Sequence, residues 1–447
     1  MNRNIQRRTF LAAAGAAGAA GALPAPGSGP WQAGVAKVAI TPREPVWLAG
    51  YGARNKPSEG ALHDIWVKAL ALRDASGAIS VVLTSDILGF SRQMAAEAAV
   101  RVEKQYGAPR ERLALTSSHT HSAPVTGNVL RPAYDIDERQ IKVIERYTAD
   151  LLGKVVEVIG AAIRDLAPAQ LSFGQERAGF AVNRRPAEYP RPVDHDVPVL
   201  AVRGAGGNLR AVLFGYACHN TVLSGYEVSG DYSGFAQIAL EKQHPGAVAL
   251  FVAGCGADAN PLPRRKVELA AAYGNILAEA VTLVVNGKMR PLAPSLEAAF
   301  THVDLHFQTP PTRDELTARL KAAPAEARHA RHLLDILDRE GRLPDRYPYP
   351  VQVWRFSGSP GLTWIVLGGE VVVDYALRFK RQYGVADTWV TGYSNDVFAY
   401  IPSVRVLKEG GYEGATSMVP YGQPAPFRAT VEEAVAETVD ELVRRTR

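Results

Sequence analysis

The chain contains the stretch Leu113-Ala114-Leu115-Thr116-Ser117-Ser118-His119-Thr120-His121-Ser122-Ala123-Pro124, in which an apolar run passes directly into a polar turn with two histidines. We interpret residues 113–116 as a short strand and the remainder as the loop after its carboxyl end. Residues 211–217 and 247–253 repeat this arrangement, because each is an apolar, β-like run that ends in a polar turn. Functional residues gather where strands end, so we expect them in these turns.

Segments with helical spacing alternate with these runs along the chain. Further strands are predicted at residues 35–40, 80–84, 351–356 and 362–367. Helices are predicted at residues 93–106, 141–166, 267–285 and 431–445. This alternation predicts an α/β fold with a mixed β-sheet core covered by helices.

One segment has a different composition. Residues 312–341 are charged and rich in alanine, leucine and arginine, and prolines flank them. Pro324 interrupts the helical pattern, so we expect two helices rather than one. The pattern predicts a helical hairpin inserted at residues 312–345, either as a plain solvated helix pair or as a lid.

The overall composition excludes some classes of partner. Of 447 residues, 47% are hydrophobic and 21% are charged, which is typical of a globular protein with a large core. The formal net charge of +5 falls to +2 without the three arginines of the first 28 residues. The chain has no basic run with interleaved aromatic residues, so no nucleic acid partner is expected.

The N-terminus resembles a twin-arginine export signal, because Arg7-Arg8 precedes an Ala/Gly stretch. That stretch is too short and glycine-rich to favour the alternative, a first transmembrane helix. We therefore expect a signal peptide at residues 1–29, cleaved between Ala20 and Gly29. The expected route is the bacterial twin-arginine export machinery, and the expected destination is the periplasm or the exterior.

The chain has two cysteines, Cys218 and Cys255. An oxidising destination permits a disulfide between them. The equal alternative is a pair of small buried thiols.

Two histidine motifs are candidate metal sites. On an extended backbone His119 and His121 share a face, so both imidazoles reach one point, and imidazole suits zinc. Hydrogen bonding without a metal is the alternative for this pair. His219 follows the apolar run 211–217 and stands near the glycine turn at residues 229–234, which contains Asp231 and leads into a helix.

Three further motifs lie in predicted loops. The glycine-rich turn at residues 254–261 permits close approach of a ligand, or is a tight structural turn. Glu370 follows two glycines at a strand end, where a carboxylate serves as a metal ligand, as a general base or only as a solvated group. The tyrosines Tyr393, Tyr400 and Tyr412 are, by themselves, typical packing or hydrogen-bonding residues.

Taken in order, these motifs resemble the neutral/alkaline non-lysosomal ceramidase family over nearly the whole mature chain. Residues 119–124 are similar to the family signature H-T-H-S-[GA]-P. Other segments follow the family pattern in the same order: 34–42 with 50–51, 183–184, 219, 229–234, 369–370, 395–400 and 412–415.

This resemblance implies roles for individual residues. The family binds one zinc through two histidines, a glutamate and a tyrosine, which implies one Zn²⁺ per chain. The implied metal ligands are His119, His219, Glu370 and Tyr400. The implied catalytic residues beside the substrate are His121, Arg184 and Tyr412. We further expect Asp231 or Asp258 to orient a zinc histidine from behind.

The chain departs from the family pattern in two places. Residues 256–261 lack the serine that the family carries in its Gly-Asp-x-Ser-Pro-Asn loop, so no serine nucleophile is expected there. The sequence after Tyr412 has room for only a short helix, where ceramidases carry an immunoglobulin-like domain. We therefore expect residues 30–447 to form a ceramidase-like catalytic domain with the inserted hairpin.

The implied function is hydrolysis of an amide bond, in ceramide or another N-acyl compound, by attack of zinc-bound water. His121 would hold the water or pass a proton to the leaving amine, and Tyr412 and Arg184 would stabilise the oxyanion. The expected substrate is a small molecule or a lipid, and a lipid substrate implies transient contact with a membrane surface. The alternatives are an esterase or lactonase that uses the same site, and a non-catalytic periplasmic solute-binding protein.

Overall fold

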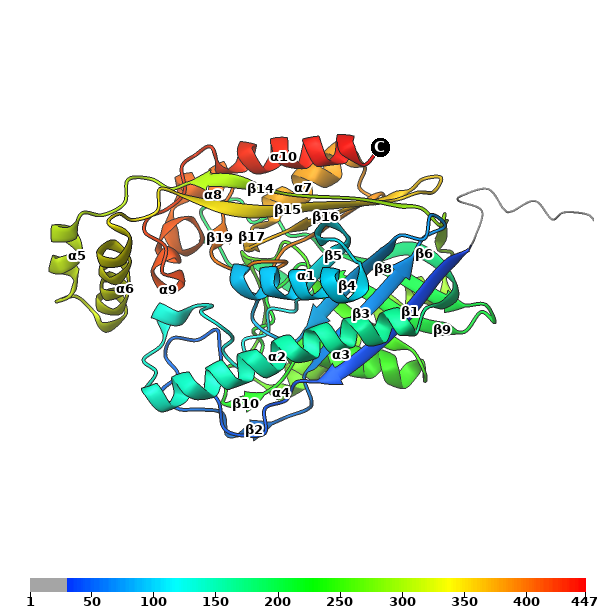
Figure 1. Cartoon of the computed structure of the whole chain (residues 1–447), viewed down its shortest axis with the longest axis horizontal. Coiled ribbons are helices and arrows are strands. Elements are labelled where there is room, and N and C mark those ends of the chain that lie inside the picture. The colour runs from blue at the N-terminus through cyan, green and yellow to red at the C-terminus, as the bar shows by residue number, and fades with distance from the viewer. Residues whose placement is uncertain (1–29) are drawn as a thin grey trace, which may run out of the picture.

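The computed structural model describes residues 30–447, so the predicted signal peptide at residues 1–29 lies outside the described residues. Two β-sheets stack on each other at the centre of the molecule, and helices cover their outer faces (Figure 1). The predicted α/β fold with a mixed sheet covered by helices is confirmed. The second sheet is an addition that the sequence patterns did not predict.

The larger sheet has nine strands in the order β11-β9-β8-β6-β1-β3-β4-β5, with β13 paired to β6 beside this path. The pairs β11–β9 and β4–β5 are parallel, and the other pairs are antiparallel. Its strands are β1 (Trp31–Ala39), β3 (Trp66–Arg73), β4 (Ile79–Ser85), β5 (Leu113–Ser117), β6 (Ala167–Arg177), β8 (Asp196–Gly204), β9 (Leu209–Tyr216), β11 (Val248–Ala253) and β13 (Arg290–Leu292).

The first and last strands of this path, β11 and β5, approach each other, and one segment of chain joins their ends. The amide of Gly392 donates to the carbonyl of Ala253 at 3.1 Å, and the amide of Asn395 donates to the carbonyl of Leu115 at 2.7 Å. The carboxyl ends of β5, β9 and β11 therefore lie close together, where the three polar turns meet.

The smaller sheet consists of β14 (Leu296–His306), β15 (Arg346–Phe356), β16 (Leu362–Leu367) and β18 (Thr388–Thr391). Aromatic side chains fill the space between the two sheets. The ring of Trp31 packs on Phe356 with centroids 6.2 Å apart, and Phe173 packs on Trp389 at 6.1 Å. Burial of such large apolar surfaces is the main stabilising term for a layered core.

Helices cover both outer faces. α1 (Arg92–Tyr106) and α2 (Glu138–Arg164) lie over β3 and β4, and α3 (Asp231–Gln243) and α4 (Val267–Asn286) pack together beside β11 and β6. α7 (Val373–Tyr383) and α10 (Val431–Arg445) cover the smaller sheet. Of the described helices, α4 alone is long and apolar enough to cross a membrane, a test that buried core helices also pass.

The predicted hairpin is present as α5 (Arg313–Arg319) and α6 (Pro324–Glu340), with Pro324 at the start of the second helix. It lies at one end of the molecule beside α9 (Figure 1). Arg328 donates to the backbone carbonyls of Pro132 and Ala133 at 3.2 and 3.1 Å, and a ring nitrogen of His329 lies 2.9 Å from the carbonyl of Gln423. The hairpin is therefore attached to the body of the protein by polar contacts.

Short elements complete the chain: β2 (Gly60–Ala61), β7 (Ala181–Asn183), β10 (Glu227–Val228), β12 (Ala259–Pro261), β17 (Glu370–Val371), β19 (Tyr400–Ile401), α8 (Val404–Glu409), α9 (Met418–Tyr421), the 3₁₀ turns Arg110–Arg112 and Arg131–Ala133, and the π-helical turn Tyr412–Thr416. The predicted strands and helices are confirmed, with ends that differ by up to five residues.

Cys218 and Cys255 are buried, free thiols, so the structure favours that alternative over a disulfide.

Candidate metal centre

His119 stands directly after β5 in a strained backbone conformation, with φ of 59°. Non-glycine residues rarely adopt positive φ, and such strain is commonly found at functional sites. Its Nδ1 lies 2.8 Å from the carbonyl oxygen of Leu88. A carbonyl only accepts, so Nδ1 carries the proton and Nε2 presents its lone pair to the site.

His219, which follows β9, has the same arrangement. Its Nδ1 lies 2.9 Å from the carbonyl oxygen of Gly256, so Nε2 again carries the free lone pair. Burial and the nearby Arg184 lower the pKa of His219 to about 4. The imidazole is therefore neutral at pH 7, which is the form that binds a metal.

Glu370 and Tyr400 are neighbours across the short parallel pair β17–β19. Oε2 of Glu370 lies 3.0 Å from Nε2 of His219 and 3.2 Å from Nε2 of His119. The hydroxyl oxygen of Tyr400 lies 3.3 Å from Nε2 of His219.

These four donor atoms fit a metal ion. Bonds of 2.0–2.1 Å in a tetrahedral zinc site place neighbouring ligand atoms about 3.3 Å apart. Three of the separations among these atoms, Glu370–His219 at 3.0 Å, Glu370–His119 at 3.2 Å and Tyr400–His219 at 3.3 Å, are close to that value. All four side chains are buried, and two imidazoles, a carboxylate and a phenol form a donor set that suits zinc.

His121 lies beside the same four atoms. Its Nε2 is 3.2 Å from Nε2 of His119, and potential ligand atoms of His119, His121 and His219 all lie within 4.8 Å of one another. A side chain at Gly50 would clash with it, because a Cβ there would lie 2.3 Å from the ring. The geometry alone therefore allows His121 either as an additional ligand or as a free imidazole next to the metal.

Arg184 and Tyr412 lie on the Tyr400 side of the centre. Arg184 Nη2 donates to the Tyr400 hydroxyl at 2.9 Å, and Nε donates to Glu413 at 2.7 Å. The ring of Tyr412 packs against that of Tyr400 with centroids 5.3 Å apart, and Tyr412 is 45% exposed. Tyr412 therefore stands where the buried centre meets solvent.

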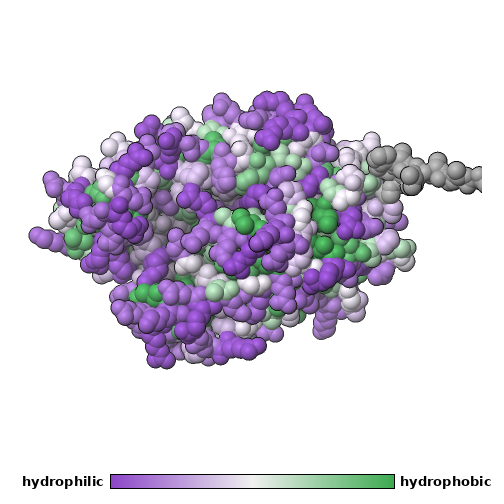
Figure 2. Space-filling view, in the orientation of Figure 1, coloured by the Kyte–Doolittle hydropathy of each residue, from purple (hydrophilic) through white to green (hydrophobic). Residues whose placement is uncertain are grey.

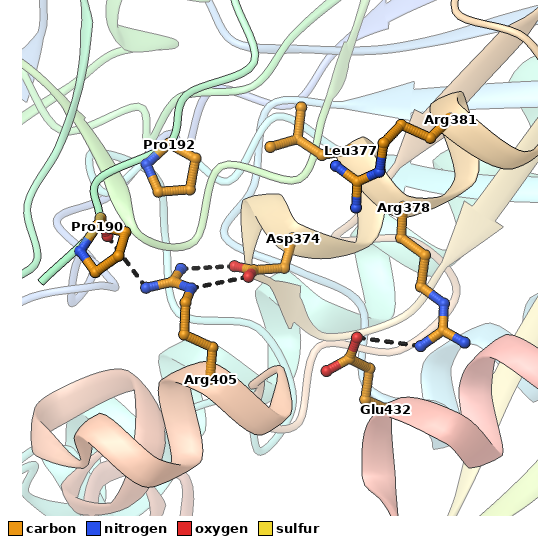
Figure 3. A pocket seen from close by; sticks show the side chains of 8 residues that line it. All are labelled: Pro190, Pro192, Asp374, Leu377, Arg378, Arg381, Arg405 and Glu432. Atoms are coloured by element: carbon orange, nitrogen blue, oxygen red, sulfur yellow. Dashed lines mark hydrogen bonds and ion pairs between the residues drawn. The ribbon is translucent and has the colours of Figure 1, made fainter.

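A chain of ion pairs continues from Arg184 away from the centre. Glu413 also accepts from Arg185 at 2.7 Å, and Arg185 pairs with Glu409 at 3.0 Å. Arg405 pairs with Glu409 at 2.8 Å and with Asp374 at 2.7 Å. Figure 3 shows this last pair in the wall of a pocket of about 380 Å³, where its charges are already matched.

The expected role of Asp258 and Asp231 as orienters of a histidine is wrong. Asp258 accepts from the amide of Val373 at 3.0 Å and from the side chain of Asn183 at 2.9 Å. The side chain of Asp231 accepts only from backbone amides, those of Val222 at 3.2 Å, Leu223 at 2.8 Å and Tyr232 at 2.7 Å. Neither carboxylate contacts a histidine of the centre. The Nδ1 atoms of His119 and His219 instead lie next to the backbone carbonyls of Leu88 and Gly256.

The sequence reasoning missed Tyr421. Its hydroxyl donates to Oε1 of Glu370 at 2.5 Å, and its side chain is buried. No motif or spacing marks Tyr421, since it reaches Glu370 only through the fold. The same holds for Glu413, which holds Arg184 in place.

The buried group of His119, His121 and His219 at the strand ends of this layered α/β fold could hold a metal ion. Residues 31–261 match the family described as neutral/alkaline non-lysosomal ceramidase, N-terminal, and this match spans just over half of the chain. The chain therefore belongs to that family, which is metal-dependent and hydrolyses an amide bond. The family resemblance predicted from the motifs is confirmed.

Solved structures share the fold. The crystal structure of neutral ceramidase from Pseudomonas aeruginosa matches with a TM-score of 0.72 and 18% identity, over 92% of this chain and 74% of that chain. A structure described as ceramidase complexed with C2 matches with the same values. No curated protein matches the chain.

The N-terminal prediction is confirmed separately. Residues 4–24 match the twin-arginine translocation signal, which indicates export to the periplasm or beyond.

Proposed function

We propose that the chain is a zinc-dependent amidohydrolase that cleaves the amide of ceramide or another N-acyl compound. The proposal takes residues 30–447 as one hydrolase domain with the inserted hairpin. The observation that carries it is the cluster of His119, His219, Glu370 and Tyr400, in which three donor-atom separations of 3.0, 3.2 and 3.3 Å are close to those of a tetrahedral metal site. Zinc bound there would polarise the scissile carbonyl and lower the pKa of water towards ~7.

The surrounding side chains supply the remaining steps. His121 lies beside the proposed ligands and is the group placed to hold the attacking water and to pass a proton to the leaving amine. Arg184 holds the Tyr400 hydroxyl, and Tyr412 stands over Tyr400 at the solvent side. A phenol and a guanidinium so placed would stabilise the negative charge that develops on the carbonyl oxygen.

The test joins metal content to activity. The wild-type protein should contain one zinc per chain by elemental analysis and hydrolyse members of a panel of N-acyl lipids and small N-acyl compounds. His219→Ala should lose both the zinc and the activity. His306→Ala, on β14 of the smaller sheet, is the control and should keep both. Full activity in a zinc-free protein would refute the proposal, and cleavage of matched esters but not amides would refute the assigned bond.

A further inference from the structure

The inserted hairpin and the body of the protein form a solvent-open cavity of about 500 Å³, which we call the hairpin cavity. Its walls come from α6, the turn at residues 128–132, the start of α1 and the segment 421–423. Because Arg328 and His329 attach α6 to the opposite wall, the cavity is a fixed feature of the fold.

The hairpin cavity lies one side chain away from the proposed metal centre. Tyr421 lines the cavity, and its hydroxyl donates to Oε1 of Glu370 at 2.5 Å. The other carboxylate oxygen of Glu370 lies 3.0 Å from Nε2 of His219 and 3.2 Å from Nε2 of His119. The hairpin cavity and the proposed centre therefore share Tyr421 as a common wall.

The lining of the cavity is predominantly cationic. It contains four arginines, Arg92, Arg131, Arg339 and Arg346, and two carboxyl groups, Glu340 and Asp396. Figure 2 shows that hydrophilic residues also dominate the visible surface at this end of the molecule. Burial raises the pKa of Asp396 to about 7, so this carboxyl carries only part of a negative charge at neutral pH.

Two of the arginines form no ion pair, although the carboxyl group of Asp396 acts on Arg92 and that of Asp135 acts on Arg131 at longer range. Within residues 30–447, no carboxylate oxygen lies within 4.0 Å of a side-chain nitrogen of Arg92 or Arg131. The Arg92 guanidinium instead lies over the ring of Tyr347, 5.2 Å from its centroid. By contrast, Arg346 pairs with Asp304 at 3.3 Å. Unpaired guanidinium groups around a concave site are the donors that bind oxyanions, often through two parallel hydrogen bonds.

We propose that the hairpin cavity binds an anionic group of the substrate, so that this hydrolase acts on an N-acyl compound carrying a carboxylate, sulfate or phosphate. This inference rests on the proposed function and narrows its substrate class. Ceramide carries no such charge and would form no ion pair with Arg92 or Arg131. The charged group belongs either to the amine portion or to the acyl portion, and the assays below separate the two.

The first test uses two matched pairs of amides. N-dodecanoylglycine and N-dodecanoylglycinamide place the charge on the amine portion, whereas N-dodecylsuccinamic acid and its diamide place it on the acyl portion. In one pair the charged member should show a kcat/KM at least about tenfold higher, the size expected for hydrogen bonds to a charged group. Equal kcat/KM values within both pairs would overturn the proposal.

Variants of the cavity arginines test whether the hairpin cavity causes the preference for the charged amide. Arg92→Gln with Arg131→Gln should abolish it and leave hydrolysis of the neutral member unchanged. Arg101→Gln with Arg139→Gln removes the same charge from exposed positions on α1 and α2 outside the cavity, and should keep the preference. A preference that survives in the cavity variant would also overturn the proposal.

The second test measures binding without turnover. Thermal unfolding is followed in inorganic phosphate and in sodium chloride of equal ionic strength. Phosphate should raise the Tm of the wild type and of the control variant above that of the cavity variant, because a bound ligand stabilises the folded state. Equal shifts in all three proteins would show that the cavity binds no oxyanion. If none of the four amides is hydrolysed, the substrate assignment fails with the proposed function, and the phosphate result still decides anion binding.

Discussion

Arg184 donates a hydrogen bond from Nη2 to the hydroxyl oxygen of Tyr400 at 2.9 Å, and through this contact the buried ion pairs reach the proposed metal centre. Burial raises the pKa of Tyr400 well above its usual range, and the positive charge of Arg184 opposes that rise. A phenol binds a metal most strongly as the phenolate. Arg184 therefore favours the form of Tyr400 that a metal site needs.

Replacement of Arg184 by lysine tests this coupling. Lysine keeps the charge but lacks the planar fork that donates to Tyr400 and Glu413 together. We expect zinc affinity, measured by competition with a chelator, to fall about 10- to 100-fold, as is usual when a group behind a ligand is lost. Arg191→Lys, at an exposed position of the same loop, is the control. Unchanged zinc affinity in Arg184→Lys would contradict the coupling.

Replacement of Tyr421 by phenylalanine removes only the hydroxyl that donates to Glu370. The buried Oε1 then lacks its donor, so the free energy of unfolding should fall by about 1–3 kcal/mol in urea titrations. Zinc affinity should fall by about tenfold, because Glu370 loses the contact that orients it. Tyr226→Phe is the matched control, since its hydroxyl bonds only Asn55 near the surface. Indistinguishable zinc affinities in the two variants would rule out an orienting role.

The sequence predicted several strands that consist of a short continuous run of apolar residues. The runs that became β5, β9 and β11 each pass directly into a polar turn, and the structure has strands there. β14 was missed because exposed and buried positions mix along it. β6 was missed although its burial alternates, because Leu171 and Phe173 are its only large apolar residues. The stacking of two sheets was also missed, since it depends on contacts such as Trp31 on Phe356 between distant parts of the chain.

In the candidate site, too, the sequence predicted some residues and missed others. Residues that the motifs single out, such as His119 and Glu370, lie together in the structure. A sequence does not reveal in which direction a side chain points, which is why Asp258 was misassigned as an orienter. Tyr421 and Glu413 were missed because their partners lie far away in the sequence and no spacing rule connects them.

The burial of the Asp258 carboxyl group predicts that the stability of the protein depends on pH. Burial raises its pKa from 3.8 to about 6, so the folded state binds this proton more tightly than the unfolded state. The free energy of unfolding should therefore fall as pH rises from about 4 to about 6, by up to about 1.4 kcal/mol per pH unit for this group. Urea titrations across this range, in excess chelator, should give a shallower slope for Asp258→Asn than for the wild type. Parallel slopes would show that Asp258 titrates normally.

The division of roles between His119 and His121 leads to the most discriminating prediction. If His121 is free for proton transfer, His121→Gln should keep one zinc per chain and lose about 10²- to 10⁴-fold in kcat. His119→Gln should lose the zinc itself. Loss of zinc in both variants would make His121 a ligand and refute the division.

Gly50 gives an independent way to move His121 without changing it. A Cβ at Gly50 would lie 2.3 Å from the His121 ring, so Gly50→Ala must displace that ring and should reproduce the result of His121→Gln. Gly77→Ala is the matched control, because Gly77 has nearly the same positive φ, 90° against 95°, and a Cβ there meets nothing within 4 Å. Both alanines carry the backbone strain of positive φ, so activity lost only in Gly50→Ala is due to His121. Equal activity in the two variants would mean that the position of His121 does not matter to the reaction.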